Sequence, residues 1–226
     1  MRNAFISTFL ELAPRDPRVV LISADIGAIV FDRFRAEHPD QYLNAGVSEA
    51  NMVGVAAGLA MAGKRPFIYT IVPFVTLRCL EQIRVDICIQ QLPVVVVGVG
   101  GGLAYSTLGP THHAIEDMAI MRALPNMTVI GPATPVETRQ ATTALLVAGR
   151  AAYLRLGLAG EPVIPENDAL PLVPGTAKQL RAGNDAILLA NGRFVEYALR
   201  ASDLLAAEGL RVGVVNMHTV KPLDVA

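Results

Sequence analysis

One acidic residue, Glu49, lies at the head of an otherwise apolar, small-residue segment that runs from Tyr42 to Gly63. A first-turn glutamate beside Ser48 suits the positive N-terminus of a helix, so a purely structural role is one interpretation. The residues behind it, ANMVGVAAGLAMAG, predict a buried helix that is apolar on every face. A carboxyl group at the edge of such a low-dielectric region has its charged form disfavoured and can donate a hydrogen bond. Glu49 is therefore a candidate acid–base residue.

Two further stretches combine residue types that chemistry uses. Gly98–Gly102, GVGGG, follows an apolar run, but no helix comes directly after it, so the dinucleotide-binding fingerprint is absent. A close backbone approach is the simpler interpretation of this loop. Adjacent histidines, His112 and His113, occur in GPTHHAIED at a predicted loop-to-helix junction. One of them can face a site and move protons, or both can be ordinary surface residues.

The elements that must position these residues alternate along the chain. Continuously apolar, β-branched runs predict strands over 19–23, 66–70, 94–99, 127–131 and 152–156. Helical stretches lie between them, over 2–13, 48–62, 75–91, 114–124 and 135–148. This rhythm predicts an α/β fold with a mostly parallel sheet that carries helices on both faces.

A change of composition divides the chain. Residues 160–174, GEPVIPENDALPLVP, are rich in proline, so we predict a linker over 160–177 after a first domain over 1–159. A strand over 186–190, a helix over 194–208 and a strand over 212–216 follow. One such unit is too small for an independent sheet, so residues 178–226 are predicted to form an incomplete second α/β domain.

Bulk composition excludes several classes of protein. The 226 residues are 52% hydrophobic and 17% charged, against the usual ~25% charged, so much of the exterior is expected to face another protein. A net charge of −1 without basic runs excludes a nucleic-acid binder. No apolar stretch is long and uninterrupted enough to predict a membrane-spanning helix. Cys79 and Cys88 lack metal-ligand spacing and indicate buried free thiols in a reducing, cytoplasmic compartment.

Four stretches together resemble a known family. GVSEANMVGVAAGLAMAGKRP, EQIRVDICIQQLPV, GPTHHAIEDMAIMRALPNMTVIGPA and NMHTVKPLD are similar, in order and spacing, to the transketolase family of thiamine diphosphate enzymes. The resemblance covers nearly the whole chain. It implies a pyrimidine-binding domain, the start of a transketolase C-terminal domain, and thiamine diphosphate as the cofactor.

The resemblance also implies a cofactor site. Glu49, in the motif Gly46–Glu49, would hydrogen-bond a ring nitrogen of the aminopyrimidine and so promote proton removal from the thiazolium carbon. Phe74 would stack on the pyrimidine ring. Ile71 and Leu77 occupy positions where the family has further aromatic residues, so a more aliphatic pocket is expected. Asp25, in SADIG, matches a stretch near the cofactor and the dimer contact.

Substrate contacts follow from the same resemblance. His112 would face the reacting centre and serve proton transfer or hydroxyl recognition. Arg155, in YLRLG, would bind a substrate phosphate.

Three positions depart from the family pattern. Leu108 replaces an acidic residue that reads donor hydroxyls, Gly100 replaces a histidine, and Ile29 replaces a serine. A donor that lacks a hydroxyl is therefore expected, unless His113 or Ser106 has taken over its recognition.

The G-D-G…N motif that binds Mg²⁺ and the diphosphate in this family is absent from the sequence. A split enzyme is expected, in which a separate subunit carries the diphosphate-binding domain and its Mg²⁺, and this chain itself holds no metal. Self-association into a dimer is also expected.

The resemblance implies transfer of a two-carbon ketol or acyl unit between small-molecule substrates, from a donor to an aldehyde acceptor. One alternative is a subunit of a 1-deoxyxylulose-phosphate-synthase-like enzyme or a 2-oxo acid decarboxylating carboligase. An alternative of another class is a catalytically silent assembly partner.

Overall fold

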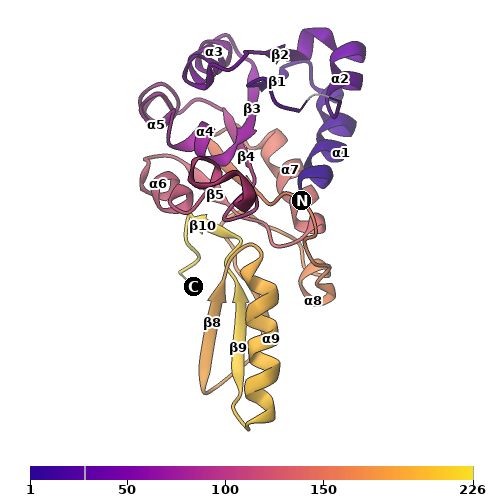
Figure 1. Cartoon of the computed structure of the whole chain (residues 1–226), viewed down its shortest axis with the longest axis vertical. Coiled ribbons are helices and arrows are strands. Elements are labelled where there is room, and N and C mark those ends of the chain that lie inside the picture. The colour runs from indigo at the N-terminus through magenta and orange to yellow at the C-terminus, as the bar shows by residue number, and fades with distance from the viewer. Residues whose placement is uncertain (28, 226) are drawn as a thin grey trace.

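The computed structural model describes residues 1–27 and 29–225. Most of these residues belong to an α/β domain with a large central sheet (Figure 1). A seven-stranded sheet has the order β10-β5-β6-β4-β3-β1-β2. Its first six strands along the chain pair in parallel, and β10 pairs antiparallel with β5 at one edge. The strands are β1 (Val19–Ser23), β2 (Tyr42–Asn44), β3 (Arg65–Ile71), β4 (Val95–Val99), β5 (Thr128–Ile130), β6 (Ala152–Leu156) and β10 (Thr219–Lys221). The predicted mostly parallel sheet is confirmed.

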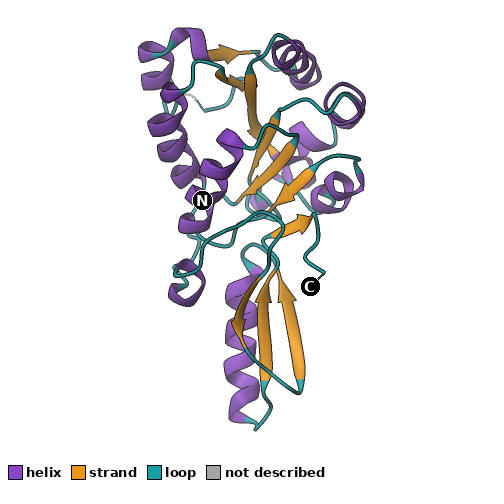
Figure 2. Cartoon of the chain, turned by 180° about the vertical axis from the view of Figure 1, so that it is seen from behind, coloured by secondary structure: helices purple, strands orange, loops and turns teal. Residues whose placement is uncertain are grey.

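Helices cover both faces of this sheet, as predicted (Figure 2). On one face, α1 (Arg2–Leu12), α2 (Asp32–Glu37) and α7 (Pro135–Val147) contribute to a core that includes Val19 and Leu21 of β1. On the other, α3 (Glu49–Met61) and α6 (Asp117–Ala123) pack with Val20 and Ile22 of the same strand. Alternate residues of a strand point to opposite faces, so an unbroken apolar run fills both cores.

The helix predicted over 75–91 is wrong in its form. The structure has a short α4 (Val72–Thr76), a turn, α5 (Leu80–Gln82) and a π-helical segment, η3 (Ile83–Ile89). Pro73, near the N-terminus of α4, suits an early helix start. The N–H groups of Leu77 and Arg78 both bond the carbonyl oxygen of Pro73, at 3.1 and 3.4 Å. The regular α-helix therefore ends at Thr76, and the chain turns before α5 begins.

The expectation that the helix after Glu49 is buried on every face is also wrong for the single chain. Met52, Val53 and Ala56 of α3 are fully buried, whereas its residues Asn51, Gly54 and Gly58 are exposed. The apolar composition of α3 therefore leaves one face of small residues open to solvent.

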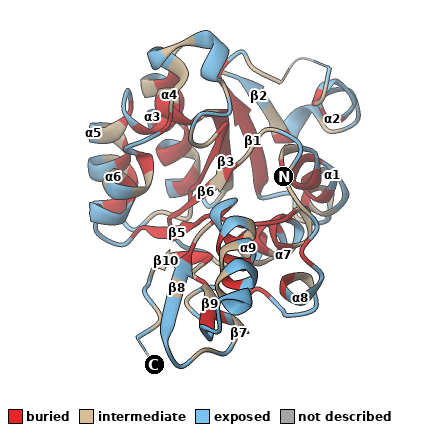
Figure 3. Cartoon of the chain, turned by 60° about the horizontal axis from the view of Figure 1, so that its bottom comes forward, coloured by how far each residue is buried: buried red, intermediate tan, exposed pale blue. Residues whose placement is uncertain are grey.

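The second unit forms a three-stranded sheet of order β7-β9-β8, with α9 packed on it (Figure 3). Its elements are β7 (Lys178–Arg181), β8 (Ala186–Ala190), α9 (Phe194–Ala207) and β9 (Val212–Asn216). Composition alone does not predict β7, β2 or β10, which are short or follow proline-rich sequence. The predicted division of the chain after residues 159 and 177 stays a prediction, since β10 returns to the first sheet.

A buried polar network joins the second unit to the first. Lys178 of β7 forms an ion pair with Glu137 of α7, 2.7 Å from Nζ to Oε1, and both side chains are nearly inaccessible. Asn216 donates hydrogen bonds to Glu137 at 2.9 Å and to Asn167 at 2.7 Å. Asn167 belongs to α8 (Pro165–Asp168), inside the predicted linker. The proline-rich segment is thus packed against both units.

Cys79 and Cys88 are free and buried, as predicted. Across the part of the chain that the structure describes, no helix is both long enough and apolar enough to cross a membrane.

Candidate functional site

The predicted site residues gather at one edge of the large sheet. Asp25 follows β1, Glu49 follows β2, Phe74 follows β3 and Gly100 follows β4. These strands are parallel, so their carboxyl ends meet along the same edge. Open α/β sheets bind ligands in this place, outside the carboxyl ends of the strands.

Glu49 is the first residue of α3 and only 3% exposed. It is not the lone acid that the sequence predicts, because Arg78 Nη1 donates a hydrogen bond to its Oε2 at 2.7 Å. In the chain by itself, a half-exposed guanidinium therefore lies in front of this buried carboxyl group, and the expectation that Glu49 holds a proton stays a prediction.

Arg78 also covers the ring of Phe74. Its guanidinium carbon lies 4.5 Å from the ring centroid, within the range of a cation–π contact. Since the two residues are four positions apart, the widened turn after α4 brings Arg78 back over Phe74 and towards Glu49. Sequence reasoning missed Arg78, because its place over Phe74 depends on this turn.

His112 lies against Phe74, with ring centroids 5.1 Å apart and planes at 67°. Thr111 Oγ1 lies 2.9 Å from His112 Nδ1, so Nε2 is the ring nitrogen left available to a ligand. The structure thus brings together Glu49, Phe74 and His112, which come from three distant parts of the sequence.

The loop that carries His112 is closed at its base. Gly102 and Ala114 exchange two backbone hydrogen bonds, at 3.1 and 2.9 Å. Within the loop, Tyr105 packs edge-on to His112, with centroids 6.1 Å apart. Its ring occupies the space beside Gly100, where an added Cβ would overlap the ring carbon Cε2 of Tyr105. Sequence reasoning missed Tyr105, whose ring fills the space beside Gly100.

The remaining predicted pocket residues are less enclosed. Leu108 is 54% exposed, Leu77 is 46% exposed and Ile71 is half-buried, so the chain alone does not shut the site. His113 Nε2 lies 3.4 Å from the carbonyl oxygen of Ser106. Ile29 is 84% exposed. Their assignments to cofactor or substrate stay predictions.

The charge of Arg155 is paired with Asp117 inside the protein. It binds Asp117 with two hydrogen bonds, of 2.7 and 3.2 Å, and donates a third to the carbonyl oxygen of Ala114 at 2.9 Å. Tyr153 also donates to Asp117, at 2.7 Å. Burial opposes the charge on Arg155, but the hydrogen bonds and charge of Asp117 outweigh it and raise the pKa of Arg155. Arg155 therefore fixes the segment directly after the two histidines, and its role in phosphate binding stays a prediction.

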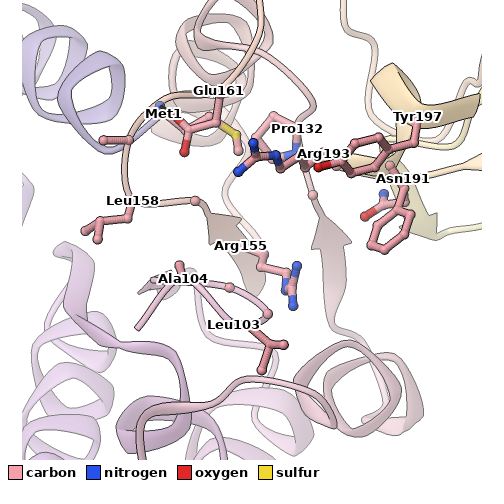
Figure 4. Close-up of a pocket in the computed structure, with 17 residues that line it drawn as sticks. Met1, Leu103, Ala104, Pro132, Arg155, Leu158, Glu161, Asn191, Arg193 and Tyr197 are labelled. Atoms are coloured by element: carbon pink, nitrogen blue, oxygen red, sulfur yellow. Dashed lines mark hydrogen bonds and ion pairs between the residues drawn. The ribbon is translucent and has the colours of Figure 1, made fainter. Parts of the chain in front are cut away.

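A cavity of about 460 Å³ lies on the Arg155 side of the glycine loop (Figure 4). Leu103 and Ala104 line it on one side, and Asn191, Arg193 and Tyr197 of the second unit line it on the other (Figure 4). The second unit thus contributes side chains next to the loop that carries Tyr105 and His112.

Asp25 is exposed and has a left-handed backbone, with φ of 48°. Asn44 joins it to the approach to Glu49: Asn44 Oδ1 accepts from the N–H groups of Asp25 and Gly46, and Asn44 Nδ2 donates to Asp25 Oδ1 at 3.1 Å. These bonds fix the loops after β1 and β2 to each other.

Cys79 lies close to Glu49 but is not a nucleophile. Burial first, and the nearby carboxylate second, raise the pKa of its thiol to about 12. Within the described residues, no cluster of three or more His, Cys, Asp or Glu side chains could hold a metal ion.

The fold is an α/β domain with predicted site residues at the carboxyl edge of its sheet, followed by a second, smaller α/β unit. The family model of the transketolase pyrimidine-binding domain matches residues 1–156, and that of the transketolase C-terminal domain matches residues 175–226. The chain belongs to the transketolase family.

Two curated relatives are subunits of split enzymes. The chain is 36% identical to one subunit of an apulose-4-phosphate transketolase from Phocaeicola vulgatus, over 99% of the chain and 72% of the relative. It is 38% identical to a subunit of a 6-deoxy-6-sulfo-D-fructose transketolase from Clostridium sp., over 99% of the chain and 70% of the relative. A solved structure described as a split gene transketolase, inactive beta4 tetramer, has a TM-score of 0.88 and 35% identity, covering 99% of the chain and 72% of that protein.

Proposed function

We propose that this chain is the pyrimidine-binding subunit of a split thiamine diphosphate enzyme, which transfers a two-carbon ketol or acyl unit from a donor to an aldehyde acceptor. The observation that carries the proposal is the contact of one planar cation with both Glu49 and the ring of Phe74. A flat group that stacks on Phe74 can at the same time hydrogen-bond a buried carboxyl group.

These residues fit an aminopyrimidine. The Arg78 guanidinium is planar, carries N–H donors, and lies over the Phe74 ring with one donor 2.7 Å from Glu49 Oε2. It serves as a stand-in for the planar, hydrogen-bonding edge of the cofactor ring. In this proposal the cofactor and Arg78 compete for the same face of Phe74 and for the same carboxylate oxygen.

The residues of the chain then have distinct roles. Thiamine diphosphate, when bound, supplies the carbanion chemistry. Phe74 binds and orients the ring, and Glu49 holds a proton at its carboxyl oxygen, facing a ring nitrogen. His112, held between Phe74 and Tyr105 with Nε2 free, exchanges a proton with a substrate oxygen. The loop contacts of Arg155 and Ala114 keep His112 in place.

A partner subunit completes the site in this proposal. It carries the diphosphate-binding domain and holds the Mg²⁺, because the sequence lacks the motif for both. The two curated relatives are themselves described as subunits. The open face of α3, with exposed Gly54 and Gly58, supports self-association into a dimer. In this proposal two partner subunits join the dimer, and the resulting heterotetramer is cytoplasmic. The dimer interface is expected to exceed ~1,600 Å².

The relatives also bear on the donor. The substrates named for the two split relatives are a ketose phosphate and a sulfonated ketose, so a ketose with an anionic end is the favoured class. A 2-oxo acid remains the alternative, because a 1-deoxy-D-xylulose-5-phosphate synthase from Thermomicrobium roseum is 38% identical over 99% of the chain, which spans 36% of that enzyme. The expectation of a donor without a hydroxyl stays a prediction, and Tyr105, whose ring lies beside Gly100, is a further candidate for reading a donor hydroxyl.

Reconstitution tests the proposal. The chain is mixed with the diphosphate-binding subunit, thiamine diphosphate and Mg²⁺, and turnover is measured with ketose phosphates, unphosphorylated ketoses and 2-oxo acids. The proposal expects activity of the pair and none of either chain alone. Stable assembly without turnover of any donor would instead identify the chain as a catalytically silent partner.

A further inference from the structure

We propose that the hydroxyl group of Tyr105 hydrogen-bonds a hydroxyl oxygen of the donor substrate and thereby makes Tyr105 a specificity-determining residue. This inference rests on the proposed function and names one residue of that same site. Four observations carry it: the fit of Tyr105 to Gly100, its contact with His112, the free hydroxyl, and the absence of another candidate among its described neighbours.

Tyr105 and Gly100 are matched in shape. Gly100 has a φ of +86°, and its N–H and that of Gly101 both donate to the carbonyl oxygen of Leu156 at 2.9 Å, which fixes the backbone. A Cβ at residue 100 would lie well under 3.0 Å from two ring carbons of Tyr105. The ring therefore keeps this place because residue 100 has no side chain.

Tyr105 lies beside the histidine that faces the reaction. The rings of Phe74 and Tyr105 both contact His112 edge-on, at 5.1 and 6.1 Å between centroids. All three belong to the carboxyl edge of the sheet, and Tyr105 and His112 share the loop that Gly102 and Ala114 close. The ring of Tyr105 therefore lies next to the histidine that faces the substrate in the proposed function.

The phenol is prepared to act as a hydrogen-bond donor. Tyr105 is half-buried, and its hydroxyl has no hydrogen-bond partner among the residues that the structure describes. Burial raises the pKa of Tyr105, and the more distant charge of Arg2 lowers it by a smaller amount. A neutral phenol can donate a hydrogen bond to a hydroxyl oxygen of a substrate.

The other polar side chains of the loop are less suited to this task. His113 Nε2 already lies 3.4 Å from the carbonyl oxygen of Ser106, and Ser106 itself is exposed. Leu108 has no polar atom and is 54% exposed. Tyr105 is the remaining group of the loop that combines a free hydroxyl with contact to His112.

The test compares donors within each variant of the reconstituted pair. We measure kcat/KM for xylulose 5-phosphate and for pyruvate, which carries no hydroxyl group, with one aldehyde acceptor. Tyr105→Phe keeps the ring and removes the hydroxyl, so kcat/KM for the ketose should fall about fivefold to tenfold while that for pyruvate changes less than twofold. The ratio of the two values is independent of how much protein is folded. Thr143→Val, which removes an exposed hydroxyl group on α7, is the control and should leave the ratio unchanged.

Gly100→Ala tests the same idea without changing Tyr105. The added methyl group displaces the ring, so the ratio should shift in the same direction as in Tyr105→Phe. Gly63→Ala is the control for backbone strain, because Gly63 has the same φ of +86° but no atom within 4 Å of the added Cβ. It should leave the ratio unchanged.

The outcomes separate the two proposals. If the wild-type pair turns over donors and Tyr105→Phe and Gly100→Ala leave the ratio unchanged, Tyr105 does not read the donor and the proposed function stands. If an assembled, cofactor-loaded wild-type pair turns over no donor at all, the proposed function fails and this inference fails with it.

Discussion

Replacing Arg78 with methionine should tighten cofactor binding. In the chain alone, Arg78 pairs with Glu49 and covers Phe74, so binding of the pyrimidine ring must first break both contacts. The Arg78 side chain is 49% exposed, which limits the ion pair to ~1 kcal/mol. The cation–π contact adds ~0.5–1 kcal/mol.

The two contacts together stabilise the cofactor-free state by ~1.5–2 kcal/mol, and each 1.4 kcal/mol corresponds to a factor of ten. Thiamine diphosphate should therefore bind the Arg78→Met pair roughly tenfold to thirtyfold more tightly than the wild-type pair. Methionine keeps an unbranched side chain at this position and removes the guanidinium that makes both contacts.

Titration of thiamine diphosphate into the assembled, Mg²⁺-containing complex, followed by isothermal calorimetry, measures this change. Arg84→Met, an exposed arginine six residues further along the same region, is the control and should leave the Kd unchanged. Equal or weaker binding by Arg78→Met would refute the reasoning, because Arg78 would then not compete with the ring.

Three further perturbations test the supports of the site. Asp117→Asn leaves Arg155 without its counter-charge and should cost ~3 kcal/mol, seen as a fall of about 6–12 °C in Tm; an unchanged Tm contradicts this. Lys178→Met breaks the buried ion pair with Glu137 and should lower the unfolding free energy, measured in urea, by a similar amount. Adding Glu137→Gln should recover part of the loss, whereas losses from the two single substitutions that simply add would count against an interaction between the two side chains. Burial raises the pKa of the Cys79 thiol from 9.0 to about 12, so the neutral thiol contributes its full share of the unfolding free energy below pH 9 and loses it as the pH rises towards 12. Cys79→Ala should therefore reduce the fall in unfolding free energy above pH 9 by about 1 kcal/mol per pH unit. An equally steep fall in the variant would oppose this.

The regular elements could be predicted from local sequence. Continuous apolar runs give β1, β6, β8 and β9 with the bounds that the structure has. Such runs are typical of strands buried on both faces, as β1 and β6 are, whereas Ile187 and Leu189 of β8 are exposed. Thr134, with Pro135 after it, marks the start of α7, where its hydroxyl accepts from the N–H of Glu137. The short β2 and β10 depend on pairing with distant strands, so their own few residues carry little signal.

The candidate site was predictable only in part. Glu49, Phe74 and His112 could be placed through family motifs, and the parallel sheet then brings them to one edge. Arg78 and Tyr105 could not, because their roles arise from a widened turn after α4 and from the empty space beside Gly100. Contacts of this kind are set by tertiary geometry and leave no periodic pattern in the sequence. The exposed face of α3 was missed for a related reason, since composition does not tell a buried helix from one that a partner covers.

The central claim is that Glu49 of this chain activates a cofactor bound across two subunits. Hydrogen–deuterium exchange at the thiazolium carbon of bound thiamine diphosphate, measured by quenched-flow NMR on the reconstituted pair, reports that step directly. Glu49→Gln keeps the size and a hydrogen-bonding group but removes the carboxyl, so exchange should slow by at least ~100-fold while the cofactor remains bound. An unchanged exchange rate in the cofactor-loaded Glu49→Gln pair would contradict the account.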